Sequence, residues 1–370
     1  GVVEGAMGFY DGVSGTTDTA SAAHLARAAA IPAVLIVRPK GQSLSLAAEL
    51  HGFRTFAKNT LAGVILNGVS AAMYPFYRTI AERSGLRAYG FLPPVAEAAI
   101  PDRHLGLVTA AEIEDLQYRL DRLADTAEQG LDLDGLAELA RTAPPLEEHP
   151  EQMLPTVSPP VRIAVAQDSA FCFYYADNLE RLASLGAELV RFSPLEDALL
   201  PEGVDGLYLG GGYPEIPAAA LAANTPMLAQ LQEAHRRGVA IYAECGGLMY
   251  LGSTLEDASG EIYPMANLIP GHSKMGKRLT RFGYCEARAM RKTLLAAPGE
   301  TLRGHEFHYS DFTPESPAVL ACRKVRDGMT LQQWSGGWQV GNAFASYLHL
   351  HFAQRPTMLN HWLAAARSAL

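Results

Sequence analysis

The chain has 370 residues, of which 48% are hydrophobic and 19% are charged. A chain of this length and composition buries more than one core, so we expect two globular domains and exclude an intrinsically disordered protein. Its formal net charge of -9 has the wrong sign for a protein that wraps nucleic acid. No apolar run reaches the roughly 20 residues that cross a bilayer. We therefore expect neither a nucleic acid nor a membrane as partner.

The cysteines are too far apart to form a zinc motif or a disulfide framework. No C-x-x-C pair occurs among Cys172, Cys245, Cys285 and Cys322, and no signal peptide pattern opens the sequence. We expect reduced thiols and a cytoplasmic location.

The first half of the chain has the pattern of an α/β domain. From about residue 20 to 140, helix-period stretches alternate with short apolar runs such as PAVLIV (32–37) and AGVILN (62–67), and a charged, leucine-spaced helical stretch covers 110–140. Short apolar runs between helices are typical of a parallel sheet that is covered on both faces. We assign residues 1–141 to this first domain.

A segment dense in proline and glutamate, residues 142–160, has no periodicity and is the predicted linker. After it, residues 161–370 form the predicted second domain. Apolar runs at 161–168, 188–195, 203–212 and 239–245 alternate with helical patterns, and the texture becomes β-rich from Tyr263. The pattern predicts a second open, mainly parallel sheet.

The strongest chemical signal is YAECGGLMYLG (242–252), in which an apolar run ends at Glu244 and Cys245, followed by two glycines and an apolar helical pattern. This order predicts a strand-to-helix elbow, from which a nucleophile projects. The N-terminus of the helix also stabilises a thiolate. The alternative is a small buried structural cysteine.

Two further segments are candidates for the same site. In SYLHLHF (346–352), His349 and His351 alternate along an apparent strand and so share one of its faces. One of them can act as the base for Cys245, and the other supports it or is an ordinary polar residue. In LYLGGGYPE (207–215), a glycine run at a strand end can direct N–H groups at an oxyanion, although a plain turn is the alternative.

The order LGGGYPE, AECGG, SYLHLHF resembles class I glutamine amidotransferase domains of the corrinoid amidotransferase family. The resemblance implies that Cys245 attacks the amide carbon of L-glutamine, that His349 activates the thiol, and that N–H groups of Gly211 and Gly246 form the oxyanion hole. Most class I glutaminases carry a glutamate two residues after this histidine, where this sequence has His351. The orientation of His349 and the role of His351 are left open.

Three blocks, KRLTRFGY (277–284), GHEFHYS (304–310) and SYLHLHF, narrow the resemblance to the branch that forms a,c-diamides. It implies ATP-dependent amidation of the a and c acetate groups of cobyrinic or hydrogenobyrinic acid. Lys277, Arg278 and Arg281 are candidates for binding this polyanion, or else form a solvated basic face. Whether the chain forms a homo-oligomer is left open.

The opening VVEGAMGFYDG (2–12) resembles a segment of dethiobiotin synthetase-like P-loop NTPases, in which an acidic residue at a strand end contacts Mg²⁺. The resemblance implies Glu4 as metal ligand and Asp11 near the phosphates. It implies Asn67 as a contact of the nucleotide base, unless Asn67 caps the next helix. The phosphate loop G-x-x-x-x-G-K-[ST] is absent from the sequence. We expect that loop to lie upstream, so that this first domain is incomplete at its N-terminus.

Other functions fit the same motifs. A related amidotransferase acting on another acceptor, as cobyric acid synthase or a nickel sirohydrochlorin a,c-diamide synthase does, or on a cell-wall precursor, would share the glutaminase signals. A cysteine hydrolase would use the same elbow without ATP. A non-catalytic binding protein would keep an amidotransferase-like sheet without a reactive Cys245.

Overall fold

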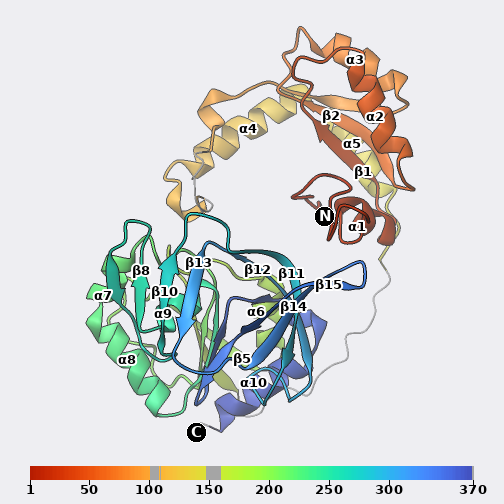
Figure 1. Ribbon diagram of the computed structural model, residues 1–370. Helices are drawn as coiled ribbons and strands as arrows, with labels where there is room; N and C mark the ends of the chain where they lie inside the picture. The colour runs from red at the N-terminus through yellow and green to blue at the C-terminus, as the bar shows by residue number, and fades with distance from the viewer. Residues whose placement is uncertain (101–107, 109, 147–159, 369–370) are drawn as a thin grey trace. The chain divides into compact units, whose positions relative to one another are not determined.

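The computed structural model describes residues 1–100, 108, 110–146 and 160–368 (Figure 1). The chain divides into two compact units, residues 1–150 and 151–370. The division falls inside the segment 142–160 that the sequence suggests as a linker, of which residues 147–159 lie outside the described residues. Among the described residues, no helix is both long and apolar enough to cross a membrane.

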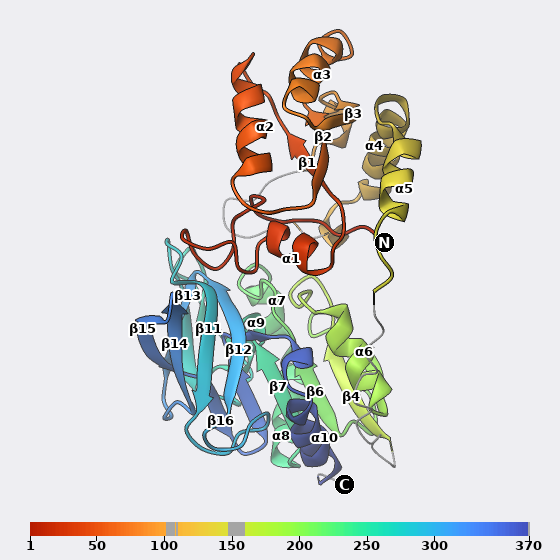
Figure 2. The same ribbon diagram turned by 90° about the vertical axis from the view of Figure 1, so that its right-hand side faces the viewer.

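The first unit is built on a parallel sheet, as predicted. Its strands lie in the order β1-β2-β3, and Figure 2 shows helices α2 and α5 on opposite sides of them. Apolar side chains such as Leu46, Val64 and Ile80 form its core. The strands are β1 (Ala33–Val37), β2 (Leu61–Asn67) and β3 (Arg87–Leu92), and the first helices are α1 (Ala22–Ala28), α2 (Ser45–Thr55) and α3 (Tyr74–Arg83).

The helical stretch predicted over 110–140 is two α-helices, α4 (Leu116–Gly130) and α5 (Leu133–Arg141), preceded by a 3-10 turn, η2 (Ala110–Glu112). The break has a local cause, because the Asp132 carboxylate accepts the N–H of Gly135 at 2.9 Å and so caps α5. A second 3-10 turn, η1 (Ala96–Ala98), follows β3.

The strand expected to end at Glu4 is absent from the described part of the chain, so that prediction is wrong. Residues 1–6 have no regular structure, and Val2 and Val3 are 100% and 62% exposed. A strand forms only where a neighbouring strand satisfies its backbone groups and its apolar side chains are covered. Neither condition is met here.

The second unit contains a six-stranded sheet in the order β16-β17-β7-β6-β4-β5, parallel except for the edge strand β16. This confirms the predicted open, mainly parallel sheet. Its strands are β4 (Val161–Ala166), β5 (Ala187–Phe192), β6 (Gly206–Leu209), β7 (Ala240–Glu244), β16 (Trp338–Val340) and β17 (Ala343–Ser346). The helices of this unit are α6 (Ala176–Ser184), α7 (Ala218–Ala223), α8 (Thr225–Arg236), α9 (Gly246–Leu251) and α10 (Thr357–Arg367).

The β-rich part predicted after Tyr263 forms two further sheets, in the orders β15-β14-β11-β12-β18 and β13-β10-β8-β9. The five-stranded sheet consists of β11 (Arg281–Ala289), β12 (Thr301–His308), β14 (Leu320–Arg326), β15 (Met329–Gly336) and β18 (His349–Leu350). The four-stranded sheet consists of β8 (Thr254–Glu256), β9 (Ile262–Pro264), β10 (Gly271–Met275) and β13 (Ser310–Pro314). A 3-10 turn, η3 (Phe352–Gln354), follows β18.

Both faces of β7 are buried, which explains its continuous apolar sequence. Ile241 and Ala243 belong to one hydrophobic core, whereas Ala240 and Tyr242 belong to the other. Alternate side chains of a strand point to opposite faces, so the two cores lie on the two sides of the six-stranded sheet. The C-terminal end of β7 is thereby held rigidly where Cys245 follows.

Candidate active site

Cys245 lies at a sharp elbow between β7, which ends at Glu244, and α9, which begins at Gly246. Its φ of +47° and ψ of -103° are strained for a residue with a side chain. Hydrogen bonds hold this conformation, since the Cys245 N–H donates to the Ser346 carbonyl at 2.8 Å and its carbonyl accepts the Met249 N–H at 3.2 Å. The predicted strand-to-helix elbow is therefore present.

The two glycines after Cys245 are required by close packing. A Cβ on Gly247 would lie 2.4 Å from the carbonyl oxygen of Leu209, and a Cβ on Gly246 would lie 2.9 Å from Cδ of Pro214. Larger side chains would therefore push α9 away from β6 and displace the elbow.

His349 is nearly buried, and its side chain interacts with both Glu244 and Cys245. Its Nδ1 lies 3.5 Å from Oε2 of Glu244, and its side chain forms a hydrogen bond with Cys245. Burial lowers the pKa of His349, but the charge of Cys245, that hydrogen bond and Glu244 together raise it to about 10. The imidazole therefore keeps its proton well above its ordinary pH range, beside the side chain of Cys245.

Sequence reasoning missed Glu244, which lies against His349 and is the third member of the candidate site beside Cys245 and His349. Its side chain is 2% exposed, and its Oε1 accepts hydrogen bonds from the Tyr242 hydroxyl and, at 3.2 Å, from the Leu350 N–H. The carboxylate is therefore fixed against His349. A charge at the end of a fully apolar strand was the signal, because a buried carboxylate needs a partner.

His351 does not share the site of His349. Strand β18 ends at Leu350, so the expected alternation along one strand face stops there and that expectation is wrong. The His351 side chain is 46% exposed, its Nε2 lies 3.5 Å from Oδ2 of Asp177, and its ring packs 5.0 Å from that of Tyr175. These contacts fit the interpretation as an ordinary polar residue.

The glycine run after β6 lies directly against the histidine. A Cβ on Gly211 would lie 2.5 Å from Cε1 of His349, and one on Gly246 would lie 3.1 Å from the Gly212 nitrogen. The loop is held through the Gly211 carbonyl, which accepts the N–H groups of Cys172 and Phe173, each at 3.0 Å. The fold thus brings Gly211, Gly246 and His349 together around Cys245.

The block GHEFHYS lies mainly on β12, with Glu306 and His308 turned into the protein. The Arg281 guanidinium lies 4.5 Å from the ring centre of Trp334, and its Nε lies 3.8 Å from Oε2 of Glu306. Arg281 is therefore part of this half-buried cluster, while Lys277 and Arg278 are exposed in the turn before β11.

The candidates in the first unit lie on its loops and at a strand end. Glu4 is exposed, and the carboxylate of Asp11 is folded over Gly8, whose Cβ would lie 2.2 Å from Oδ2. Asn67 ends β2 and does not cap the next helix, because α3 has Met73 at its N-cap. Among the described residues, no three His, Cys, Asp or Glu side chains come together as a metal site. The roles of Glu4, Asp11 and Asn67 stay predictions.

Fold and site define a glutamine amidotransferase domain, and a match to the CobB/CobQ-like glutamine amidotransferase domain covers residues 162–357. Cobyrinate a,c-diamide synthase of Salmonella typhimurium is 57% identical over 373 residues, covering 100% of this chain and 81% of that protein. The enzymes of the same name from Listeria monocytogenes serovar 1/2a and Streptococcus sanguinis are 42% and 43% identical, covering 98% and 100% of this chain and 81% of each protein. The chain belongs to the cobyrinate a,c-diamide synthase family.

Proposed function

We propose that the chain catalyses the ATP-dependent amidation of the a and c acetate carboxylates of cobyrinic or hydrogenobyrinic acid, with ammonia from L-glutamine. The observation that carries the proposal is the arrangement of Cys245, His349 and Glu244 at the end of β7, in a chain 57% identical to a cobyrinate a,c-diamide synthase over its whole length. This arrangement has the groups that an acyl transfer from an amide requires.

In the proposed glutaminase half-reaction, the Cys245 thiolate attacks the amide carbon, and the carbonyl π electrons move onto oxygen. The N–H groups of Gly211 and Gly246 stabilise that oxyanion. His349 donates its proton to the leaving nitrogen, so ammonia departs as the thioester forms. His349 then accepts a proton from water, which hydrolyses the thioester to glutamate and restores the thiolate. Glu244 holds the ring through Nδ1.

The acceptor carboxylate must first carry a leaving group, which ammonia can then displace. In the proposed synthetase half-reaction, ATP phosphorylates the carboxylate and ammonia expels phosphate. We propose Glu4 as a ligand of Mg²⁺, Asp11 near the phosphates and Asn67 at the nucleotide base. Mg²⁺ binds through one or two carboxylates together with phosphates, and when bound it offsets the charge of the transferred group.

We also propose a cytoplasmic location. All four cysteines are free thiols, which is the usual state of cysteine in that compartment.

The test is release of glutamate from glutamine by the wild-type chain, Cys245→Ala and the control Cys285→Ala, with and without cobyrinic acid, ATP and Mg²⁺. Cys285 is buried in a different hydrophobic core from Cys245. We expect glutamate and corrinoid amide from the wild type and Cys285→Ala, and neither from Cys245→Ala.

Other results would identify the alternatives. Glutamate release that survives Cys245→Ala would refute the glutaminase assignment. Cys245-dependent glutamate with amidation of another tetrapyrrole, and none of cobyrinic acid, would point to a related acceptor. No release in any mixture would favour a binding protein.

A further inference from the structure

The five-stranded sheet has one covered and one open face. Along β11, Cys285, Ala287 and Ala289 are buried, whereas Phe282 and Tyr284 are 57% and 59% exposed. A sheet face open to water is normally polar. The part of this face near the active site is aromatic instead, and a contiguous exposed aromatic surface marks a binding site.

We define the aromatic patch as Phe282, Tyr284, His305 and Phe307. Phe282 is the register partner of Phe307, and their ring centres lie 5.7 Å apart. Tyr284 is the register partner of His305, with ring centres 6.5 Å apart. Directly opposite residues of an antiparallel pair lie on the same face, so the four rings form two adjacent rows.

One of these rows continues to the active site. His305 is the register partner of His349, and their rings stack at 4.9 Å with an interplanar angle of 19°. Burial and the charge of His349 lower the pKa of His305 to about 4, so its ring is neutral at pH 7. The aromatic patch therefore begins directly beside His349, the histidine proposed to act on glutamine.

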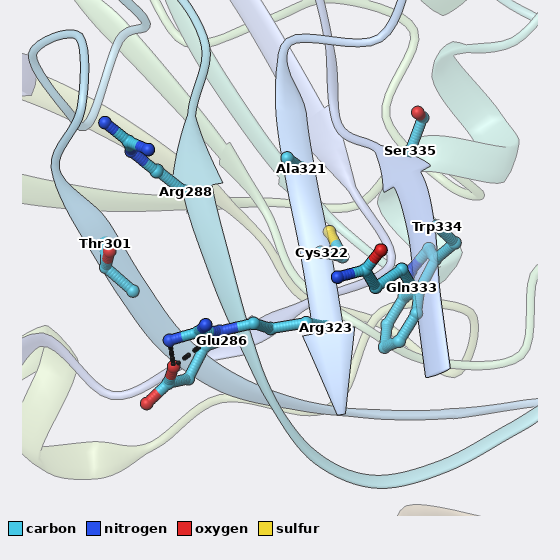
Figure 3. A pocket seen from close by; sticks show the side chains of 9 residues that line it. All are labelled: Glu286, Arg288, Thr301, Ala321, Cys322, Arg323, Gln333, Trp334 and Ser335. Atoms are coloured by element: carbon cyan, nitrogen blue, oxygen red, sulfur yellow. Dashed lines mark hydrogen bonds and ion pairs between the residues drawn. The ribbon is translucent and has the colours of Figure 1, made fainter. Parts of the chain in front are cut away.

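The other end of the same face is polar. Nε and Nη2 of Arg323 lie 3.0 and 2.7 Å from Oε2 of Glu286, and Nε of Arg303 lies 3.6 Å from Oε1 of Glu286. Glu286 and Arg323 line a depression of about 550 Å³ (Figure 3). The change from polar to aromatic along one face shows that the patch is a local feature.

Positive charges lie next to the aromatic patch. Lys277 and Arg278 are exposed in the turn that leads into β11, and neither forms an ion pair with any described residue. Nζ of Lys324 donates to the carbonyl oxygen of Phe282 at 2.7 Å. Exposed rings beside free cations suit a ligand with an apolar face and an anionic rim.

We propose that the aromatic patch binds one face of the corrin macrocycle of the acceptor, and that Lys277 and Arg278 contact its peripheral carboxylates. This inference rests on the proposed function. A corrin is a broad, largely apolar ring system with carboxylates around its edge, which matches the patch in shape and charge. Binding there also brings the acceptor close to His349, so that ammonia travels a short path before water protonates it.

The test is a titration of the full chain with cobyrinic acid in the presence of a non-hydrolysable ATP analogue and Mg²⁺. Binding is measured from the quenching of tryptophan fluorescence. For Phe282→Ala/Phe307→Ala we expect a Kd at least about tenfold higher than for the wild type. Lys277→Glu/Arg278→Glu should raise the Kd similarly at low salt and make it less salt-dependent. The control Met329→Ala/Leu331→Ala removes exposed apolar side chains of β15, 65% and 47% exposed, and should bind as the wild type does.

Size-exclusion chromatography and thermal melting accompany each titration, so that misfolding is recognised and the lysine–arginine variant gives an independent result. Equal Kd values for the wild type, Phe282→Ala/Phe307→Ala and Lys277→Glu/Arg278→Glu would refute the proposal. Equal Kd values with a changed oligomeric state would assign the face to self-association instead. If the wild type binds no cobyrinic acid although Cys245 hydrolyses glutamine, both the patch and the proposed acceptor are wrong while the glutaminase half stands.

Discussion

The carboxylate of Glu244 determines which form of His349 the active site holds. It lies 3.5 Å from Nδ1, so a proton on Nδ1 is favoured, and in the proposed reaction Nε2 is left to exchange protons. In Glu244→Gln the size of the side chain is kept, but the charge is lost. We expect kcat/KM for glutamine hydrolysis to fall by about 10²–10⁴, since removing the orienting carboxylate of such a triad has effects up to that order. Tyr242→Phe, which removes only one hydrogen bond to Glu244, should cost much less.

The pH profile separates this role from a merely structural one. Because the pKa of His349 is raised to about 10, the imidazolium persists above its ordinary range, and its contribution is lost as pH rises through about 10. Glu244→Gln removes one of the groups that raise this pKa, so the alkaline limb of kcat/KM should move to lower pH. An unchanged alkaline limb with reduced kcat would show that Glu244 supports the structure of the site and does not act through the pKa of His349.

Gly211 is the position of the glycine run that lies directly against His349. In Gly211→Ala the new Cβ would lie 2.5 Å from Cε1 of His349, so the imidazole must move. A displacement of about 1 Å at a reacting group can cost about 10²-fold in rate, and we expect a loss of that order in glutamine hydrolysis with little change in Tm. Gly15→Ala, where the added Cβ meets no atom within 4 Å, is the control. Wild-type activity of Gly211→Ala would mean that the loop yields easily and does not position His349.

Sequence reasoning proposed the candidate site residues that carry local signals. Cys245 stands in a strand–glycine–helix pattern, and His349 in an apolar strand. Glu244 lies in the same motif, but its role could not be predicted, because its partner His349 is distant in sequence and comes close only through the pairing of β7 with β17. The end of β18 could not be predicted either, since tertiary contacts terminate that strand and turn His351 toward α6.

At the level of elements, helix α6 fixes the strand that carries His349. The buried Asn178 amide donates from Nδ2 to the Leu350 carbonyl at 2.7 Å, and its Oδ1 accepts the Phe352 N–H at 2.8 Å. In Asn178→Ala both backbone groups lose their partner. We expect a loss of about 2–6 kcal/mol in the free energy of unfolding, from about 1–3 kcal/mol for each of the two unsatisfied buried groups. Urea denaturation measures it.

Asn178→Ala should also impair catalysis, because β18 is no longer held in register with the elbow. We expect kcat for glutamine hydrolysis to fall under conditions where the variant is folded. Glu180→Ala, an exposed change on the same helix, should alter neither quantity. Loss of stability with unchanged kcat would show that β18 is positioned by its pairing with β12 alone.

The β-α-β order was predictable in both halves because it rests on hydrophobic periodicity. Apolar runs at 32–37, 62–67 and 161–168 correspond to β1, β2 and β4. The opening segment was not predictable in this way, since its apolar residues resemble a strand locally and only the presence of a neighbour decides whether one forms.

At the level of the whole molecule, the two units should unfold separately. The core of the first unit lies around a three-stranded sheet, whereas the second buries two cores around a six-stranded sheet. Stability depends on buried apolar area, so the first unit should unfold at lower urea concentration. All three tryptophans, Trp334, Trp338 and Trp362, belong to the second unit, so their fluorescence reports that unit alone. We expect far-UV circular dichroism to show an early transition that tryptophan fluorescence does not show, with glutamine hydrolysis lost only in the later one. Coincident transitions by both probes would mean that the two units fold as one cooperative body.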